Sequence, residues 1–372
     1  MTSLCLSYIL STENMGIWSK VIQITTDGKV NHVLNGAADW VYEEEFSMAK
    51  AFDWSPDGQK IAFIRFDESE VPEFNMQLWG KLYPQDYKFK YPKAGESNAK
   101  VSIHFYDLAG KKTVKADTGT ETDIYLPRIY WTGEANTLAF LRVNRLQSQI
   151  DLLYTDAQTG QSQVVLEEKS ETYVDLNYND DLRFLGDNKG FIRTSEHDGF
   201  KHIYHHDNQG NLIRQITSGR WEVTNLVGVD EKGKKIYYIS TEASPLERNL
   251  YVISLDGKNK KILTPEKGTY SVNMSKDFKY FIANFSNSAT PLKVTLNEAS
   301  GKLLKVLEDN QELKSKLSTF ALSGKEFFSF NTVDGTPLNG YMIKPADFDP
   351  NKKYPVLMYV YGGPGSQNVL NS

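Results

Sequence analysis

The chain has 372 residues, enough for one large domain or two ordinary ones, and a formal net charge of -5. Apolar residues make up 40% of the sequence and aromatic residues 12%, which is typical of a globular protein rich in β structure and excludes disordered and collagen-like chains. Acidic and basic residues are mixed along the chain, so no footprint for nucleic acid or an anionic membrane surface is present. We therefore expect a small or peptide ligand and no nucleic-acid partner.

The N-terminal segment differs from the rest of the sequence. Residues 1–20 are mildly apolar, but no basic residue precedes the apolar stretch and no clear cleavage site follows it, so they make a poor secretory signal. No apolar run approaches the about 20 residues that span a bilayer. Cys5 is the single cysteine, so no internal disulfide can form, which fits a reducing compartment and many periplasmic proteins. We treat residues 1–20 as an atypical N-terminal segment.

Three consecutive glutamates, Glu43, Glu44 and Glu45, lie among aromatic residues in the stretch Trp40–Phe46. A free peptide N-terminus is positively charged at neutral pH because its pKa is about 8, and two carboxylates can accept hydrogen bonds from such an ammonium group. Adjacent side chains of a strand point to opposite faces, so Glu44 and Glu45 can converge on one ammonium only from a helical turn or a bulge. The alternative interpretation is a solvated acidic loop.

A repeat of two interleaved hairpin series occupies the middle of the chain. The turns of the first series begin at Asp107, Asp156, Asp207, Asp256 and Asn297. The second series begins at Trp54, Trp131, Phe184, Val229 and Met274. Two hairpins in about 45 residues give four strands, which is the period of a β-propeller blade. We expect at least five blades, and six in total, within residues 21–322. We also expect a single helix within residues 308–320.

The interval between Trp54 and Trp131 is about 30 residues longer than the repeat predicts. The excess falls at Met76–Asn98, a segment rich in tyrosine, proline and lysine. This pattern indicates an arm at about residues 76–98 that is inserted into one blade, or else a long loop folded onto its own blade. An exposed aromatic arm is often an interaction element.

The repeat ends after Phe320, and residues 323–372 have a different pattern. A strand pair and a proline-containing loop precede the apolar run Tyr354–Tyr361, which two glycines terminate. A continuous apolar strand of this kind is typical of a parallel sheet, so we expect the beginning of an α/β domain. Tyr361 is a candidate catalytic residue, because a tyrosine hydroxyl beside flexible glycines can donate to a developing oxyanion; the alternative role is packing.

Other chemistry-bearing residues give weaker signals. The chain contains no G-x-S-x-G nucleophile motif, and Ser366 is interpreted as a loop serine. His202, His205 and His206 lie across a predicted hairpin without a second set of ligands, which favours surface histidines over a zinc site. We expect no metal and no cofactor.

Several motifs together resemble one family. They are, in chain order, Asp39–Phe46, Trp54–Gly58, Tyr91–Asn98, Asp198–Tyr204 and Tyr354–Gln367. The same motifs occur in the same order in dipeptidyl peptidase IV, within the prolyl oligopeptidase family, and the resemblance extends from about residue 21 to the end of the chain. The glycine-rich segment near the C-terminus resembles bacterial members.

The resemblance implies a fold, an activity and roles for particular residues. It implies an eight-bladed propeller that caps an α/β-hydrolase domain, and a serine exopeptidase that removes X-Pro or X-Ala dipeptides from peptide N-termini. Glu44 and Glu45 would hold the substrate ammonium, Tyr361 would stabilise the oxyanion, and the arm would contribute to a homodimer together with the hydrolase domain. Relatives are periplasmic, secreted or membrane-anchored.

Two expectations follow from departures from the family pattern. The catalytic serine, aspartate and histidine of the family would lie beyond Ser372, so the chain corresponds to a propeller with a truncated hydrolase domain and should be inactive alone. The family's substrate-binding arginine would precede the glutamates, and nothing in residues 1–20 matches its segment. The alternative function is a non-catalytic β-propeller scaffold that binds partners through Met76–Asn98, because the fold alone does not determine function.

Overall fold

The structure is a computed structural model that describes residues 9–11, 20–176, 180–186, 189–363 and 365–372. The chain divides into two compact units, which we describe separately. Unit 1 comprises Met1–Ile192 with His206–Leu212, and unit 2 comprises Arg193–His205 with Ile213–Ser372. Most of the predicted N-terminal segment, residues 1–20, lies outside the described residues.

The first large sheet of unit 1 has five antiparallel strands. They are β3 (Val33–Asn35), β4 (Phe52–Trp54), β5 (Lys60–Asp67), β8 (Lys100–Asp107) and β9 (Lys112–Lys115). The order is β3-β5-β8-β9, and β4 also pairs with β5. β5 is central and almost wholly buried, which agrees with its apolar sequence KIAFIRFD. The predicted arm leaves this sheet after β5 and returns to it at β8; we call the residues that join the arm to these two strands the arm root.

The second large sheet of unit 1 has the order β10-β11-β12-β13. Its strands are β10 (Ile124–Trp131), β11 (Thr137–Asn144), β12 (Gln149–Asp156) and β13 (Ser162–Lys169). Asp156 forms the turn after β12, where its carboxylate accepts hydrogen bonds from the backbone N–H groups of Gln158 (2.9 Å) and Thr159 (2.7 Å). Gly160 completes the turn with φ +76°, and a Cβ there would lie 2.2 Å from the Lys115 carbonyl oxygen. Only glycine fits this position without rearrangement.

Three further sheets repeat the same antiparallel order. One contains β14 (Leu182–Phe184), β15 (Phe191–Ser195), β16 (His202–His206) and β17 (Leu212–Gln215), and the boundary between the units runs through it. The next contains β18 (Val223–Asp230), β19 (Lys235–Ser240), β20 (Asn249–Ser254) and β21 (Lys261–Ile262). The last contains β22 (Thr269–Met274), β23 (Tyr280–Asn287), β24 (Thr290–Glu298) and β25 (Leu303–Glu308).

The predicted repeat of four strands is confirmed, and every predicted turn lies between two consecutive strands of one sheet. Five sheets of four or five strands occur among the described residues. A sixth of that size is not found there; β1 (Ile9–Ser11) and β2 (Lys20–Ile22) form a sheet of two strands. The architecture is therefore mostly β and propeller-like, as the sequence predicts.

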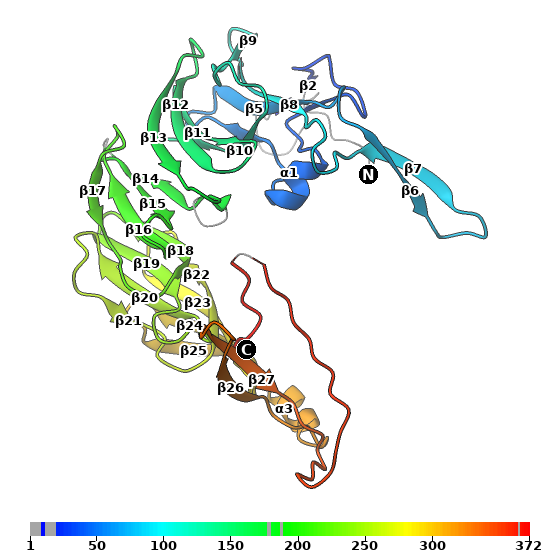
Figure 1. Cartoon of the computed structure of the whole chain (residues 1–372). Coiled ribbons are helices and arrows are strands. Elements are labelled where there is room, and N and C mark those ends of the chain that lie inside the picture. The colour runs from blue at the N-terminus through cyan, green and yellow to red at the C-terminus, as the bar shows by residue number, and fades with distance from the viewer. Residues whose placement is uncertain (1–8, 12–19, 177–179, 187–188, 364) are drawn as a thin grey trace. The chain divides into compact units, whose positions relative to one another are not determined.

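The inserted segment is a β-hairpin with a sheet of its own. β6 (Glu73–Leu78) pairs with β7 (Gln85–Lys90) and with no other described strand, and the hairpin extends away from the first sheet (Figure 1). All six residues of β6 are exposed. An arm therefore leaves the sheet after β5, and it begins three residues before the predicted position of Met76.

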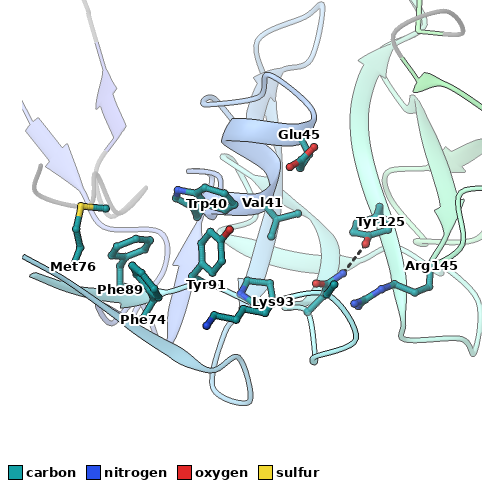
Figure 2. A pocket seen from close by; sticks show the side chains of 13 residues that line it. Trp40, Val41, Glu45, Phe74, Met76, Phe89, Tyr91, Lys93, Tyr125 and Arg145 are labelled. Atoms are coloured by element: carbon teal, nitrogen blue, oxygen red, sulfur yellow. Dashed lines mark hydrogen bonds between the residues drawn. The ribbon is translucent and has the colours of Figure 1, made fainter. Parts of the chain in front are cut away.

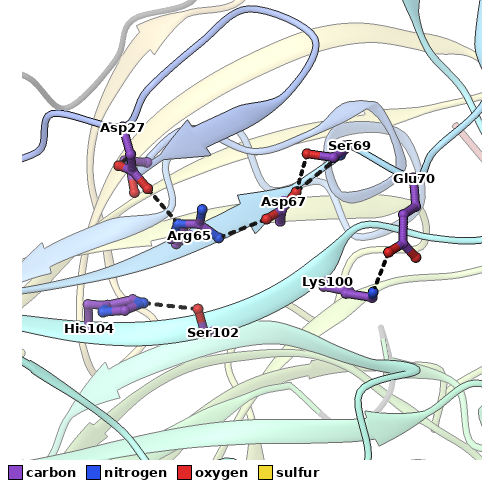
Figure 3. A network of polar contacts seen from close by, with 9 residues as sticks. Asp27, Arg65, Asp67, Ser69, Glu70, Lys100, Ser102 and His104 are labelled. Carbon is purple, nitrogen blue, oxygen red and sulfur yellow. Dashed lines mark hydrogen bonds and ion pairs between the residues drawn. The ribbon is translucent and has the colours of Figure 1, made fainter.

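A polar network holds the chain at the end of β5, just before the arm begins (Figure 3). The Arg65 guanidinium pairs with Asp27 at 2.8 Å and with Asp67 at 3.3 Å. The Asp67 carboxylate also accepts hydrogen bonds from the hydroxyl and the backbone N–H of Ser69. These Ser69 bonds lower the pKa of Asp67, so its charge is retained at neutral pH. Lys100 on β8 pairs with Glu70 at 2.6 Å and ties the same segment to the sheet.

The C-terminal region of unit 2 contains the predicted helix but not the predicted parallel strand. α3 (Gln311–Leu317) lies within the predicted helical segment, and β26 (Glu326–Asn331) pairs with β27 (Pro337–Met342). The run Tyr354–Tyr361 forms no strand, and every residue of it after Tyr354 is exposed; Leu357, for example, is 97% exposed. A parallel strand needs neighbours to bond its backbone groups, and no described strand lies alongside this run. The expected parallel strand of an α/β domain is thus not formed here.

The prediction of surface histidines is wrong for His202 and His206, which are 0% and 8% exposed. The His202 ring packs edge-on against Trp221 with ring centroids 4.8 Å apart, and the His206 ring stacks on Phe191 at 5.2 Å. The His202 ring contacts Thr217 Oγ1 at 3.1 Å and the Gly219 carbonyl oxygen at 3.0 Å. Among the described residues, no cluster of His, Cys, Asp and Glu has the geometry of a metal site. No helix of the described chain is both long enough and apolar enough to cross a membrane.

Candidate functional site

The three glutamates lie at the end of a short helix, α1 (Trp40–Glu45). Asp39 is the N-cap: its backbone is extended, and its carboxylate accepts a hydrogen bond of 2.9 Å from the Tyr42 backbone N–H. The helix stops at Phe46, and Ser47 follows with φ +50°, a left-handed conformation that ends a helix. The predicted local irregularity at Glu44 and Glu45 is therefore confirmed as a helical turn.

Tyr42 anchors α1 to unit 1. Its side chain is 2% exposed, and its hydroxyl oxygen accepts a hydrogen bond of 2.7 Å from the Leu126 backbone N–H on β10. Its ring packs edge-on against Phe66 on β5 at 4.8 Å and against Phe46 at 5.1 Å. Burial raises the pKa of Tyr42 well above its usual value, so the hydroxyl stays neutral. The buried face of α1 is thus fixed by two sheet strands.

Glu43, Glu44 and Glu45 follow Tyr42 on α1, and all three are exposed. None of these carboxylates has a lysine, arginine or histidine of the described chain within 4.0 Å. Successive residues of an α-helix differ in direction by about 100°, so Glu44 points closer to the direction of Glu45 than Glu43 does. Three like charges without a cation leave an acidic surface that is complementary to a positively charged ligand.

A pocket of about 620 Å³ lies beside the end of α1 (Figure 2). Its walls come from α1, from the arm hairpin and its C-terminal root, and from residues in and next to the β10–β11 hairpin. The lining residues are Trp40, Val41, Glu45, Phe74, Met76, Phe89, Tyr91, Pro92, Lys93, Ala94, Asn98, Tyr125 and Arg145. Glu45 lines this pocket and Glu44 does not. Their joint role stays a prediction.

One wall of the pocket is aromatic. Trp40 on α1 packs against Tyr91 with ring centroids 4.2 Å apart, and Tyr91 packs against Phe74 at 5.5 Å. Phe74 in turn contacts Phe89 across the arm hairpin at 5.7 Å. This continuous row of rings connects the arm to α1, and Glu45 at the end of α1 lines the same pocket (Figure 2).

The opposite wall is polar. The Tyr125 hydroxyl accepts a hydrogen bond of 2.8 Å from Asn98. Arg145 is already engaged, by Asp123 at 3.2 Å and by the Glu96 carbonyl oxygen at 2.8 Å. The Lys93 ammonium lies 6.0 Å from the Phe74 ring centroid and has no carboxylate of the described chain within 4.0 Å. The pocket therefore combines an aromatic wall, one carboxylate and two cations.

Two carboxyl groups of unit 1 are buried: Asp39 at the N-cap of α1 and Glu68, which directly follows β5. Burial raises the pKa of Asp39 to about 6. Burial, and then the nearby carboxyl of Asp39, raise the pKa of Glu68 to about 7. Both groups therefore change charge near neutral pH, and one of them, Asp39, is the N-cap of α1.

The predicted catalytic residue, Tyr361, lies in unit 2. Tyr361 is 65% exposed and belongs to the strand-free segment, and its carbonyl oxygen accepts a hydrogen bond from Asn368 at 3.1 Å. Its role in stabilising an oxyanion stays a prediction. Ser366 forms a turn with Gly363, in agreement with its interpretation as a loop serine.

Sequence reasoning missed the supporting residues of the site. Asp39 carried a usable signal, because aspartate just before a helical segment is a common N-cap. Tyr42 and Tyr125 carried none, because their roles depend on contacts between segments that are far apart in the sequence.

The repeated four-stranded sheets, with the inserted hairpin and the glutamate helix, define a propeller-like β protein. Residues 8–292 match the sequence model of the family described as the dipeptidyl peptidase IV (DPP IV) N-terminal region. The chain therefore belongs to the dipeptidyl peptidase IV N-terminal region family.

Individual relatives agree with this assignment. A probable dipeptidyl peptidase 4 of Arthroderma benhamiae is 31% identical over 375 residues, covering 95% of this chain and 47% of the relative. A probable dipeptidyl-aminopeptidase B of Aspergillus terreus is 33% identical over 386 residues, covering 94% and 41%. The crystal structure of Porphyromonas gingivalis dipeptidyl peptidase 4 is similar with a TM-score of 0.90 and 43% identity, covering 95% of this chain and 50% of that one. The chain spans about half the length of the relatives it matches.

Proposed function

We propose that the chain is the substrate-recognition part of a serine-type dipeptidyl peptidase that releases X-Pro or X-Ala dipeptides. In this proposal Glu44 and Glu45 bind the N-terminal ammonium of the substrate. The observation that carries it is the acidic surface of α1, whose exposed carboxylates have no cation of the described chain as partner. The names of the relatives, which are dipeptidyl peptidases and aminopeptidases, support the reaction class.

The recognition step follows from charge and rigidity. An ammonium group offers three N–H donors, and each charge-assisted hydrogen bond to a carboxylate is worth about 1.5–3 kcal/mol. Because Tyr42 and the Asp39 cap hold α1 in place, little conformational entropy is lost when the ammonium binds. A fixed position for the ammonium places the second peptide bond of the substrate at a set distance, which explains release of two residues.

The chemical step needs groups in addition to those of α1. We assign the Tyr361 hydroxyl as an oxyanion donor. Since the chain contains no G-x-S-x-G motif, we place the serine nucleophile and its histidine and aspartate in sequence beyond residue 372. We therefore expect these 372 residues alone to bind substrate peptides without cleaving them. No cofactor is needed for this reaction class.

The test is calorimetric binding of Ala-Pro peptides with a free or an acetylated N-terminus. We expect acetylation to weaken binding at least tenfold, because one lost charged hydrogen bond corresponds to about 1.4 kcal/mol or more. Glu44→Gln and Glu45→Gln should each weaken binding of the free amine, and Glu43→Gln is the matched control. Equal binding of free and acetylated peptides would contradict the proposal and favour a non-catalytic scaffold.

We also propose that the arm hairpin contributes to a homodimer. The loop between β6 and β7 exposes three large apolar side chains, Trp79 (73%), Leu82 (87%) and Tyr83 (79%), which is unusual for a monomeric surface. Sedimentation velocity at several concentrations should detect self-association that Trp79→Ser with Leu82→Ser abolishes. A concentration-independent monomer would exclude this role for these residues in the present chain.

A further inference from the structure

We propose that a lysine-rich end of two sheets in unit 2 binds the phosphate groups of an anionic lipid surface. Four turns form this end: β18–β19, β20–β21, β22–β23 and β24–β25. Consecutive strands of an antiparallel sheet run in opposite directions, so alternate turns lie at the same edge. We call these turns, residues 230–235, 254–261, 275–279 and 298–302, the lysine face. None of them belongs to α1 or to the pocket beside it, so the inference is independent of the proposed function.

Contacts between the turns show that they share one surface. The two sheets pack on a common apolar core. In the first sheet, the Leu255 backbone N–H of one turn donates to the Lys234 carbonyl oxygen of the other at 3.0 Å. In the second sheet, a backbone hydrogen bond of 2.8 Å likewise joins the two turns. The Lys261 ammonium connects the sheets, since it donates to the Ser300 carbonyl oxygen at 3.2 Å.

The lysine face is basic, although the chain has a formal net charge of -5. Its four turns contain nine lysines and five acidic residues, which gives the face a formal net charge of +4. The corresponding turns of the two large sheets of unit 1, residues 55–60, 107–112, 132–137 and 156–162, contain three lysines and four acidic residues. A hairpin turn at this end of a sheet is therefore not basic in general. Charges that are mixed along the sequence are segregated here by the fold.

Most acidic residues of the lysine face serve their own turns. The Asp230 and Asp256 carboxylates accept hydrogen bonds from backbone N–H groups of the same turn at 2.8 and 3.1 Å. Asp277 and Glu298 each pair with one lysine of the same turn, at 3.1 and 3.6 Å. Six exposed lysines have no carboxylate of the described chain within 4.0 Å: Lys232, Lys234, Lys235, Lys258, Lys261 and Lys276. These ammonium groups are available to an external anion.

The spacing of the turns favours an array of phosphates over a single anion. Neighbouring strands lie about 4.8 Å apart, so the two turns of one sheet are about 10 Å apart, and packed sheets are also separated by about 10 Å. Lysines on separate turns would lose side-chain entropy if they converged on one anion. A lipid surface offers each lysine its own phosphate. Because the Debye length is about 8–10 Å at physiological salt, neighbouring turns contribute to one positive potential.

Two exposed apolar side chains at the same end of the second sheet distinguish a lipid surface from a soluble polyanion. Tyr280 and Leu303 directly follow the β22–β23 and β24–β25 turns, and they are 45% and 50% exposed. Tyr280 pairs with Glu298 and Leu303 with Asn297, so both lie where the strands meet the turns. Tyrosine is enriched at membrane–water interfaces, where its ring is apolar and its hydroxyl is hydrated. A soluble polyanion would make no use of these side chains.

The simpler explanation is that the lysines only keep the turns hydrated. Charged residues on turns are usually solvated and have no binding role. The two explanations differ for anionic vesicles, because a chain with a net charge of -5 is repelled by them unless its positive charges are segregated. Binding to such vesicles therefore requires a basic face.

The test is cosedimentation of the 372-residue chain with phosphatidylcholine vesicles that contain about one third phosphatidylglycerol, and with pure phosphatidylcholine vesicles. We expect binding only to the anionic vesicles, and a loss of that binding when salt is raised from about 50 to about 500 mM. The test variant replaces four lysines of the lysine face by glutamine: Lys232, Lys234, Lys258 and Lys276. It should lower the partition coefficient at least tenfold, because each lysine near an anionic surface contributes about fivefold.

The matched control replaces four exposed lysines of unit 1 by glutamine: Lys29, Lys111, Lys112 and Lys115. It changes the net charge equally and should bind within about twofold of the wild type, since these lysines lie outside the lysine face. A third variant, Tyr280→Ser with Leu303→Ser, should weaken binding even at the higher salt concentration, because apolar contacts are not screened.

Each other outcome overturns the inference. Wild-type chain that stays in the supernatant with anionic vesicles has no lipid-binding face. Equal losses of binding in the two lysine variants, with circular dichroism showing intact folds, would assign binding to net charge and not to this end of unit 2. Binding of tripolyphosphate in solution without binding to vesicles would identify a soluble polyanion as the ligand. None of these results bears on recognition of a peptide N-terminus, which acetylation tests separately.

Discussion

Replacing Tyr42 by phenylalanine tests whether the anchor of α1 depends on one hydrogen bond. The Tyr42 hydroxyl accepts from the Leu126 backbone N–H at 2.7 Å, and Leu126 is 0% exposed. The β10–β11 register shifts between Tyr125 and Arg128, so Leu126 lies in a bulge where the strand ladder provides no partner. Tyr42→Phe keeps the ring contacts and leaves a buried N–H without an acceptor, at a cost of about 1–3 kcal/mol.

Amide hydrogen exchange measures this cost at the site itself. A loss of about 1–3 kcal/mol should speed exchange in the peptide that contains Leu126 by roughly 5- to 150-fold, if opening in this segment is local. The control is Tyr87→Phe on the arm, where the side chain is 43% exposed and the change should stay within about 0.5 kcal/mol. Unchanged exchange in Tyr42→Phe would show that Leu126 finds another acceptor, and our account of the anchor would be refuted.

Two further predictions concern unit 1. Burial raises the pKa of Asp39 from 3.8 to about 6 and that of Glu68 from 4.5 to about 7, so the folded state holds more protons than the unfolded state between about pH 4 and 7. The free energy of unfolding contributed by these groups should therefore fall as the pH rises through this range. The Asp39→Asn variant should show a weaker dependence of Tm on pH than the wild type. A wild-type Tm that rises steadily from pH 5 to 8 would contradict the prediction. In a denaturant titration, Gly160→Ala should lower the free energy of unfolding by more than Gly95→Ala does. Both glycines have positive φ, but only a Cβ at Gly160 would clash, with the carbonyl oxygen of Lys115. Equal losses of unfolding free energy would show that the turn at Gly160 relaxes.

The blade-like repeat could be predicted because its signals are local. Asp156 forms its turn through backbone N–H groups two and three residues ahead, and this arrangement follows from the short sequence alone. The arm was predicted from the excess of residues between two repeats. The helical conformation of Glu44 and Glu45 was predicted from a side-chain argument, since two adjacent strand residues cannot face one ligand.

Predictions that depended on distant partners were less successful. The histidines of β16 were expected at the surface, but His202 and His206 are buried, with ring contacts to Trp221 and Phe191 respectively. The apolar run Tyr354–Tyr361 was expected as a parallel strand, and it forms none where no described strand pairs with it. In both cases the environment of the segment, and not its own residue pattern, decided the outcome.

The sequence by itself determined the repeating antiparallel sheets, the inserted arm and the charge of the candidate site, because turn residues, spacing and side-chain type are local properties. Only the tertiary structure decided which of the glutamates lines the pocket and which groups surround it. Trp40, Phe74 and Tyr125 come from a helix, an arm and a distant strand, and their convergence depends on how sheets pack. Packing is governed by burial and shape over the whole core, which a short motif does not encode.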